Sequence, residues 1–489
     1  MSKSVVIIGG GISGLCAGCF AAERGYRVTI FEQAAVPGGL CTSWKRGDYT
    51  VDFCIHWLTG AAGKDNDLFK AWSALGAIEG LTYVFPDEFM RMVGKDGTVL
   101  SFSKDFEKLE ADLLAIAPED EREIKSFIKA IKRFAWSKFG LEQPTTVWGR
   151  LALIPRYIPL LPAFKKYGKM TLSDFGKLFK NPFLAEAFAS MWDPRLSVMV
   201  FFGMLAWHKL GICGYPIGGS TSFARAIEKR FLELGGIIHY ETTVKRVLIE
   251  GDRAVGVELG DGTCVKADYV ISAADGHQTF YNLLEGRYLT PKVESYFKEM
   301  PIFGPLLFIA FGVNRPFDTL PHQLSGSIFQ IPKTRIADRE HEWLQVKICN
   351  QDPTLAPPGR TLVTVLIDSD YDYWNQLAQN PDEYRAAKDA VAKEVARLLE
   401  GVIPGIAADI QMHDVSTPVT VNRYTGNWKG SYEGWLPTPD AIIMQMDKTV
   451  SGLRNFYMVG QWVQPGGGLP SCAMTAREVV NMLCKADKK

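Results

Sequence analysis

The chain has 489 residues, which is long enough for two domains and a large hydrophobic core. Lysine plus arginine number 54, as do aspartate plus glutamate, so no overall charge favours nucleic acid as a partner. The nine cysteines are an odd, scattered number typical of reduced thiols, and the seven histidines show no metal-ligand spacing. The first predicted strand begins within the first ten residues, which leaves no room for a secretory signal. We therefore expect a cytoplasmic protein without a metal site.

The N-terminal segment has the order strand, glycine-rich turn, helix, strand. A β-branched run at 5–8 predicts a buried parallel strand, 15–24 a helix and 27–31 a second strand. The turn has the pattern G-x-G-x-x-G, with Gly18 at the next repeat position, and its sequence is Gly9-Gly10-Gly11-Ile12-Ser13-Gly14. A pattern of this kind set between two strands is a strong signal for dinucleotide binding.

Each part of this motif has a physical role in holding a pyrophosphate. Gly9 permits the tight turn, Gly11 lets the backbone approach the phosphates, and Gly14 lets the helix lie close to the strand. The helix N-terminus adds free N–H groups and the positive end of its dipole. Glu32 lies 18 residues after Gly14, where a carboxylate accepts the hydroxyls of an adenosine ribose. The predicted cofactor-binding residues here are Gly9, Gly11, Ile12, Ser13, Gly14, Glu32 and Gln33.

A second pair of glycines follows Glu32 almost at once and favours FAD over NAD, because it suits another close backbone approach to the same cofactor. This region resembles the flavoprotein oxidoreductases of the phytoene desaturase, carotenoid isomerase and retinol saturase group. That group carries Gly-Gly-x-(Cys/Thr)-x-Ser-(Phe/Trp) and then Asp-x-Gly-x-His. The corresponding segments here are Gly38-Gly39-Leu40-Cys41-Thr42-Ser43-Trp44 and Asp52-Phe53-Cys54-Ile55-His56.

The chain departs from its relatives at three positions. Many members of the wider amine-oxidase-like superfamily have arginine where this chain has Leu40, which argues against an amine oxidase. Cys54 replaces the usual glycine, and Gln461 stands where relatives often carry an acid that binds the ribityl chain. The resemblance implies non-covalent FAD, with His56 beside the isoalloxazine and the backbone of Val244 against the adenine.

The later segments continue this pattern. Residues 214–220 open a predicted helix that runs to about 234, and 237–240, 244–250, 254–259, 269–273 and 455–461 are predicted strands. A glycine-rich loop precedes the last predicted helix, 472–484, and the resemblance implies that this loop and helix N-terminus lie against the flavin pyrimidine. The further predicted cofactor residues are Gly38, Gly39, Leu40, His56, Val244, Gly460, Gln461, Gly467, Gly468, Leu469 and Pro470.

Because the cofactor segments are discontinuous, the domains are predicted to be discontinuous too. We predict an α/β fold with a Rossmann-type FAD-binding domain of the glutathione-reductase or amine-oxidase kind, and an inserted α+β substrate domain. The FAD-binding domain comprises 1–75, 214–285 and 415–489, and the substrate domain 76–213 and 286–414. The insert contains predicted strands at 306–313, 343–350 and 361–368 and predicted helices at 105–115, 119–138 and 381–399.

Two segments of the insert are unusually apolar. Residues 145–170 combine aromatic and aliphatic residues with basic ones and have no acid, which favours peripheral contact with an anionic membrane, on the inner face of the cell membrane. The alternative is a lid over the pocket with solvated basic residues; the three prolines of the segment exclude a single regular helix. Residues 196–212 suit either an apolar pocket wall or an ordinary buried helix.

The expected chemistry is hydride transfer between FAD and an extended apolar polyene, most simply a carotenoid or other isoprenoid, by desaturation, saturation or isomerisation. NAD(P)H is a candidate reductant. His56 and Asp193 are the candidate acid–base residues, with a structural histidine and a turn before Pro194 as the respective alternatives. A reductase or reductive cyclase of a non-isoprenoid polyene is the alternative function, and a flavin-dependent lipid carrier without turnover is a third.

Overall fold

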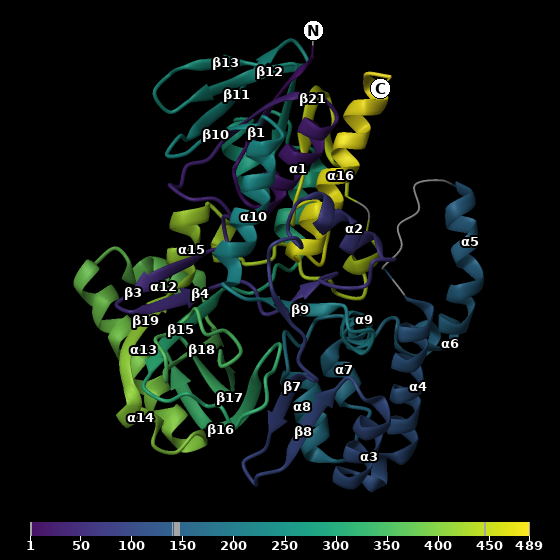
Figure 1. Cartoon of the computed structure of the whole chain (residues 1–489), viewed down its shortest axis with the longest axis vertical. Helices are drawn as coiled ribbons and strands as arrows, with labels where there is room; N and C mark the ends of the chain where they lie inside the picture. Colours follow the sequence, from purple (N-terminus) through teal and green to yellow (C-terminus); the bar gives the residue numbers. More distant parts are fainter. Residues whose placement is uncertain (1, 139, 141–146, 445, 489) are drawn as a thin grey trace.

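The computed structural model describes residues 2–138, 140, 147–444 and 446–488. Two large sheets dominate it, one of nine strands and one of seven, and a group of helices packs beside the second (Figure 1). Both chain termini lie at the end of the molecule that contains the nine-stranded sheet (Figure 1). No helix among the described residues has the length and apolar character needed to cross a bilayer.

The nine-stranded sheet is built from segments far apart in the sequence. β1 (Ser4–Ile8) lies between β2 (Arg27–Phe31) and β14 (Tyr269–Ser272), and all three are parallel. β10 (Ile237–His239) and β21 (Leu453–Met458) extend this parallel core on its two sides. The remaining strands are β11 (Val244–Glu250), β12 (Arg253–Leu259), β13 (Cys264–Lys266) and β20 (Thr449–Val450).

Three helices pack together beside this sheet: α1 (Ile12–Glu23), α10 (Gly219–Glu233) and α16 (Gly468–Ala486). α1 and α10 approach so closely that a Cβ on Gly18 would lie 2.8 Å from a ring carbon of Phe231. This close packing explains the glycine at the repeat position after the dinucleotide motif.

The predicted starts of these three helices were wrong. α1 begins at Ile12 rather than 15, because the glycine turn leads directly into the helix. Residues of the segment 214–220 first complete a strand, β9 (Cys213–Pro216), and α10 begins only at Gly219. α16 begins at Gly468 rather than 472, inside the glycine loop itself. Glycine and proline have low helix propensity, so hydrophobic periodicity is a poor guide where a helix begins among them. The predicted starts of α1 and α16 were too late, and that of α10 was too early.

The seven-stranded sheet has the order β19-β15-β18-β17-β16-β7-β8 and is antiparallel except where β16 meets β7. Its strands are β7 (Glu88–Val93), β8 (Val99–Ser103), β15 (Leu306–Val313), β16 (Ser327–Ile336), β17 (Arg339–Ile348), β18 (Thr361–Asp368) and β19 (Ile410–Ser416).

Alternation along β15 shows how this sheet divides the molecule. Leu307 and Ile309 join the core that lies under α13 (Pro381–Val402), whereas Phe308 and Ala310 join a cluster with Val51 on the opposite face. Val51 belongs to the hairpin β3 (Ser43–Arg46) and β4 (Tyr49–Asp52), which comes from the N-terminal segment. One face of the sheet therefore packs on helices, and the other faces the N-terminal segments.

Helices fill the region beside β7 and β8. An aromatic core joins them, in which Phe127 contacts Phe175, Phe188, Phe201 and Phe202. The helices are α3 (Phe106–Ile116), η1 (Pro118–Asp120), α4 (Glu121–Ser137), α5 (Val147–Tyr157), η2 (Ile158–Leu160), α6 (Leu161–Tyr167), α7 (Leu172–Gly176), α8 (Pro182–Ser190) and α9 (Val198–Lys209). The short elements β5 (Leu58–Thr59), β6 (Tyr83–Val84) and β9 connect this region to the N-terminal segment.

The remaining helices join or cover the sheets. They are α2 (Asp67–Ala74), the π-helix η3 (Gln278–Leu283), α11 (Pro291–Glu299), α12 (Tyr371–Leu377), α14 (Ile406–Asp409), α15 (Pro418–Thr425), η4 (Trp428–Gly430) and η5 (Ala441–Ile443).

Candidate functional site

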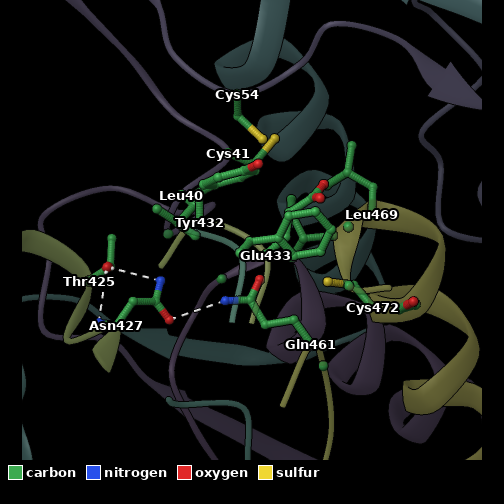
Figure 2. Close-up of a pocket in the computed structure, with 18 of the residues that line it drawn as sticks. Leu40, Cys41, Cys54, Thr425, Asn427, Tyr432, Glu433, Gln461, Leu469 and Cys472 are labelled. Atoms are coloured by element: carbon green, nitrogen blue, oxygen red, sulfur yellow. Dashed lines mark hydrogen bonds between the residues drawn. The ribbon is translucent and has the colours of Figure 1, made fainter. Parts of the chain in front are cut away.

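A cavity of about 1100 Å³ brings the predicted site residues together. Its lining combines the β1–α1 turn and the glycine loop before α16 with strands of the seven-stranded sheet. All of the predicted cofactor residues except Gly14 line it, and so do His56 and Asp193. Figure 2 shows Leu40, Gln461 and Leu469 around the same space. The volume exceeds that of an ordinary site for one small ligand, so a cofactor and a second molecule can share it.

The two glycine pairs face each other across one side of the cavity. The N–H of Gly38 donates to the carbonyl of Gly10 at 2.9 Å, and a bridge joins Gly11 to Gly38. Gly9 has φ of +98°. A Cβ on Gly14 would lie 1.9 Å from the carbonyl oxygen of Gly9, so Gly14 allows the helix to meet the turn rather than facing the cavity. The free N–H groups at the start of α1 are thus held beside the cavity, as a pyrophosphate requires.

Glu32 lies at the end of β2 and is buried. Its carboxylate accepts the N–H of Gly10 at 2.6 Å and that of Ala34 at 2.7 Å. Burial raises the pKa of Glu32, and these hydrogen bonds partly oppose the rise. The carboxylate keeps lone pairs for further donors such as ribose hydroxyls. Gln33 beside it donates from Nε2 to the carbonyl of Tyr424 at 3.2 Å.

Val244 lies close to this carboxylate. The N–H of Thr242 donates to the carbonyl of Glu32 at 2.8 Å, and Val244 begins β11 two residues later with only 9% of its surface exposed. Val244 also lines the cavity. Its position suits contact with an adenine next to the ribose. The sequence alone does not distinguish such a valine from any other buried strand valine.

The C-terminal loop lies next to the start of α1 and also lines the cavity. Gly460 has φ of +101°, and a Cβ there would lie 2.6 Å from Oγ of Ser13. Gln461 donates from Nε2 to Asn427 at 3.2 Å (Figure 2). Gly467 and Gly468 also have positive φ and lead into α16, so the positive end of this long helix points into the cavity.

His56 lies in a half-buried loop, and its ring nitrogen Nδ1 is buried. This nitrogen finds no hydrogen-bond partner among the described residues. Burial, with a contribution from Lys347, lowers the pKa of His56 to about 3, so the ring is neutral near pH 7. A buried nitrogen left unpaired next to a cavity is consistent with a partner supplied by a ligand.

The His56 loop is held by a network that sequence analysis missed. Nζ of Lys347 donates to the carbonyls of Ile55 and His56 at 3.2 and 3.3 Å, and the Ile55 N–H donates to Oγ of Ser220 at 2.9 Å. Burial lowers the pKa of Lys347. The one feature of the sequence that could have pointed to this network is Lys347 itself, a charged residue among mainly apolar ones in the predicted strand 343–350.

Two buried acids complete this network. The hydroxyl of Tyr215 donates to Oδ2 of Asp52 at 2.9 Å and lies 3.2 Å from Oδ2 of Asp352. The centre of the Tyr215 ring lies 4.6 Å from Nζ of Lys347. Asp52 also accepts the N–H of Ser220 at 2.9 Å. The network joins β17 to the N-terminal segment and α10, and so fixes the position of the His56 loop.

Asp193 lies in a turn before Pro194, as the alternative interpretation of its sequence predicted. It lies between α8 and α9 rather than within a helix, and it accepts the Arg195 N–H at 2.9 Å and an Arg195 guanidinium nitrogen at 2.6 Å. This carboxylate lines the cavity but is held in an ion pair, which weakens the case for Asp193 as an acid–base residue.

Away from the glycine loops the cavity lining is mainly apolar, with a few polar side chains such as His341, Gln345 and Asp368. One face of α9 lines the cavity, and Phe201 and Phe202 on its other face are buried in the aromatic core. The segment 196–212 is therefore both a pocket wall and a buried helix, the two interpretations that its sequence allowed. The apolar lining in this part includes Trp57, Met199, Met204, Trp207, Phe303, Phe308, Ile328, Trp343 and Leu366.

The other apolar segment, 145–170, was predicted to contact a membrane or to form a lid. None of residues 151–170 lines the cavity, which gives the lid interpretation no support. Leu160, Ala163 and Tyr167 are buried against α4, and Nζ of Lys166 forms an ion pair with Glu123 at 2.5 Å.

The residues at the glycine-rich end of the cavity fit FAD. Glycines without side chains, two helix N-termini, a buried carboxylate and an unpaired imidazole nitrogen are groups that suit the pyrophosphate, the adenosine ribose and the ring of a dinucleotide flavin. The cofactor supplies hydride transfer, and the protein binds it and excludes water.

Comparison with known proteins agrees with this geometry. Residues 12–483 match the family model described as flavin containing amine oxidoreductase. The chain is 26% identical over 509 residues to a chloroplastic prolycopene isomerase of Arabidopsis thaliana, covering 96% of this chain and 80% of that protein. It is 26% identical over 505 residues to a zeta-carotene-forming phytoene desaturase of Myxococcus xanthus, covering 98% and 94%.

A solved structure shows the same fold. Cyclohexylamine oxidase from Brevibacterium oxydans IH-35A superposes with a TM-score of 0.63 at 14% identity, covering 100% of both chains. This likeness confirms the predicted fold class, a Rossmann-type FAD-binding domain with an inserted substrate domain. The chain belongs to the family of flavin containing amine oxidoreductases and is an FAD-dependent oxidoreductase.

Proposed function

We propose that this enzyme transfers a hydride between FAD and an extended apolar polyene of the carotenoid type. The observation that carries the proposal is one continuous cavity, lined both by the glycine-rich clamp and by many aliphatic and aromatic side chains. Such a wall recognises shape rather than charge. The full-length relatives named for prolycopene isomerisation and phytoene desaturation support the same substrate class.

The test is anaerobic stopped-flow spectroscopy of the FAD-reconstituted protein. We expect a carotenoid or retinoid to change the redox state of the flavin, with a matching change of the polyene in chromatography, and a primary amine to change neither. Reaction with an amine but with no polyene would overturn the proposal. Reaction with non-isoprenoid polyenes alone would favour the reductase or cyclase alternative. NADH and NADPH are added separately to ask whether either reduces the flavin.

A pair of variants tests where the polyene lies. Gly203 of α9 lines the apolar part of the cavity, and the nearest atom to an added Cβ is Trp207 Cζ2 at 4.0 Å. Gly203→Leu should therefore fill substrate space and slow reaction with polyenes, while FAD binding and reduction by dithionite stay unchanged. Gly401→Leu on α13, where no atom lies within 4 Å of an added Cβ, is the matched control. Equal rates in the two variants would contradict this location.

Strand membership supports the proposed division of labour along the chain. The strands of the nine-stranded sheet all lie within 1–75, 214–285 and 415–489, the proposed FAD-binding segments. We propose that 76–213 and 286–414 form the substrate domain. FAD is proposed to be non-covalent, so acid precipitation should release it into the supernatant; flavin retained in the pellet would contradict this.

Peripheral contact with an anionic membrane, on the cytoplasmic face, is part of the proposal. Ile154 is 51% exposed, Ile158 56%, Leu161 61% and the neighbouring Trp136 of α4 65%. Trp136 and Pro159 line one shallow groove, so Trp136 lies next to the segment that carries the three exposed aliphatic side chains, and we propose that the four side chains form one surface. We call it the α5–α6 patch. An exposed apolar patch with basic neighbours suits an anionic lipid surface better than water.

Cosedimentation with anionic liposomes tests the α5–α6 patch. Lys165 and Lys169 are exposed, whereas Lys166 is paired with Glu123 and is left unchanged. Lys165→Glu/Lys169→Glu should cosediment less than the parent, and cosedimentation should fall as salt rises. Lys95→Glu/Lys393→Glu, an equal charge change at exposed sites elsewhere, is the control. If both double variants sediment alike, the patch does not bind lipid.

A further inference from the structure

Three carboxylates that line the cavity are already bound to protein partners. Glu32 holds main-chain N–H groups, and Asp193 is paired with Arg195. Asp275 accepts the N–H groups of Gln278 at 2.8 Å and Trp428 at 2.9 Å. These three carboxylates are therefore held in place by the fold.

The other two carboxylates in the lining, Asp368 and Glu433, have no such partner among the described residues. Asp368 lies close enough to Asp193 and Arg339 to interact with their charges, whereas Glu433 lies beside the glycine loop. The Glu433 side chain lines the cavity, and it forms no ion pair or hydrogen bond with any residue that the structure describes. Figure 2 shows it in the pocket together with Tyr432, Leu40, Gln461 and Leu469. A carboxyl group largely removed from water and left unpaired costs stability, so its retention in a cavity indicates a use there.

The backbone of Glu433 is fixed against the flavin-side loop. A Cβ on Gly467 would lie 2.0 Å from the carbonyl oxygen of Glu433, and one on Gly434 would lie 2.7 Å from that of Gln461. The carbonyl of Gly434 in turn accepts the N–H of Phe303 at 2.8 Å. These close contacts hold residues 433–434 between the glycine loop and the chain that leads into β15.

The carboxyl group itself points along the same loop. Its Oε1 lies 3.3 Å from the position that a Cβ on Gly468 would occupy, at the first residue of α16. Residues at this helix start are the ones proposed above to lie against the flavin. Glu433 therefore reaches the region where cofactor and substrate meet.

The surroundings of Glu433 tune it for proton transfer. Burial raises its pKa to about 7. The titratable groups that face it are Tyr432 and Cys472, and burial raises the pKa of Cys472 to about 11 and that of Tyr432 above its usual value, so both are neutral near pH 7. Asp193 and Asp368 also interact with Tyr432. A group with a pKa near the working pH serves both as acid and as base.

We propose that Glu433 exchanges the proton with the polyene carbon next to the one that exchanges the hydride. This inference rests on the proposed function. In a desaturation two C–H bonds break: one carbon gives a hydride to FAD, the neighbouring carbon gives a proton to the Glu433 carboxylate, and the electron pair left behind forms the double bond. In a saturation the protonated Glu433 returns the proton. His56, neutral and held by Lys347, then acts as a neighbour of the flavin rather than as the proton carrier.

The test compares Glu433→Gln with the parent, because glutamine keeps the shape but cannot titrate. We expect the parent half-reaction to show one inflection near pH 7, and Glu433→Gln to lack the inflection and to be slower by roughly a hundredfold or more. FAD binding and reduction by dithionite should be unchanged. Asp440→Asn, an exposed carboxylate on the following segment, should behave like the parent. If Glu433→Gln keeps both the rate and the inflection, the proposal is overturned.

A second readout does not depend on turnover. The absorption spectrum of bound FAD should shift with pH through about 7 in the parent and in Asp440→Asn, and the shift should be smaller in Glu433→Gln, where Asp275 of the cavity lining, whose pKa burial also raises to about 7, still titrates. Identical spectral titrations in parent and Glu433→Gln would overturn the assignment of Glu433. If no polyene reacts with the parent, the proposed function fails, and the spectral titration still decides the position of Glu433. Should glutamine prevent folding, Glu433→Asp must restore the inflection at a lower rate, or the proposal is wrong.

Discussion

Replacing Gly14 by alanine should damage the FAD site through the backbone alone. The added Cβ would lie 1.9 Å from the carbonyl oxygen of Gly9 and 3.1 Å from its carbon. Ordinary contacts begin at 3.4 Å, so the start of α1 must move away from the turn by about 1.5 Å. No side-chain rotation can relieve a contact between a Cβ and a carbonyl group.

The expected magnitude follows from this displacement. Overpacking of this kind costs about 1–3 kcal/mol of unfolding free energy. A shift of about 1.5 Å at the helix start should also weaken its bonds to the pyrophosphate, so we expect the Kd for FAD to rise tenfold or more, or by about 1.4 kcal/mol. Urea unfolding measures the first quantity, and fluorescence titration of the apoprotein with FAD measures the second.

Two matched variants make the test specific. An added Cβ on Gly18 would lie 2.8 Å from Phe231 Cε2, a side-chain atom that can move, so Gly18→Ala should cost stability but leave the Kd for FAD within about twofold. Gly401→Ala on α13 meets no atom within 4 Å and should raise stability by up to about 1 kcal/mol. If Gly14→Ala unfolds and binds FAD like Gly401→Ala, the close contact does not constrain the site and the reasoning is refuted.

Three other substitutions test the rest of the site. Glu32→Gln should raise the Kd for FAD about tenfold or more, because the ribose loses a charge-assisted hydrogen-bond acceptor; an unchanged Kd in the same titration would contradict this role. His56→Ala should slow the half-reaction yet keep its inflection near pH 7, since the pKa of His56 is lowered to about 3. Because the unfolded state binds this proton near pH 6.5 and the folded state does not, the parent should lose stability as pH falls from about 6.5 towards about 3, and His56→Ala should lose less in urea unfolding at each pH. Lys347→Met removes the hydrogen bonds to the Ile55 and His56 carbonyls and a positive charge near Asp52 and Asp352, and should cost about 3–5 kcal/mol of unfolding free energy; a loss below about 1 kcal/mol would show that the network does not hold the loop.

Local sequence determined the cofactor end of the protein. The order of strand, glycine turn, helix and strand could be predicted because each feature depends on neighbours a few residues away: β-branched runs for strands, and glycines where a side chain would meet the backbone. Glu32 was predictable for the same reason, since the length of one helix and one strand sets its distance from Gly14. Strands such as β15 and β18 were found with their bounds, because apolar runs of that length suit a sheet buried on both faces.

Tertiary structure decided which groups meet at the flavin end. Lys347 contacts the His56 carbonyl across 291 residues of sequence, and Glu433 reaches the glycine loop through the packing of three separate segments. No local pattern marks such contacts, because strand register and the crossing of the two sheets set them. The same holds for the pKa values of His56 and Glu433: the side chains are ordinary, and only burial among distant neighbours moves them.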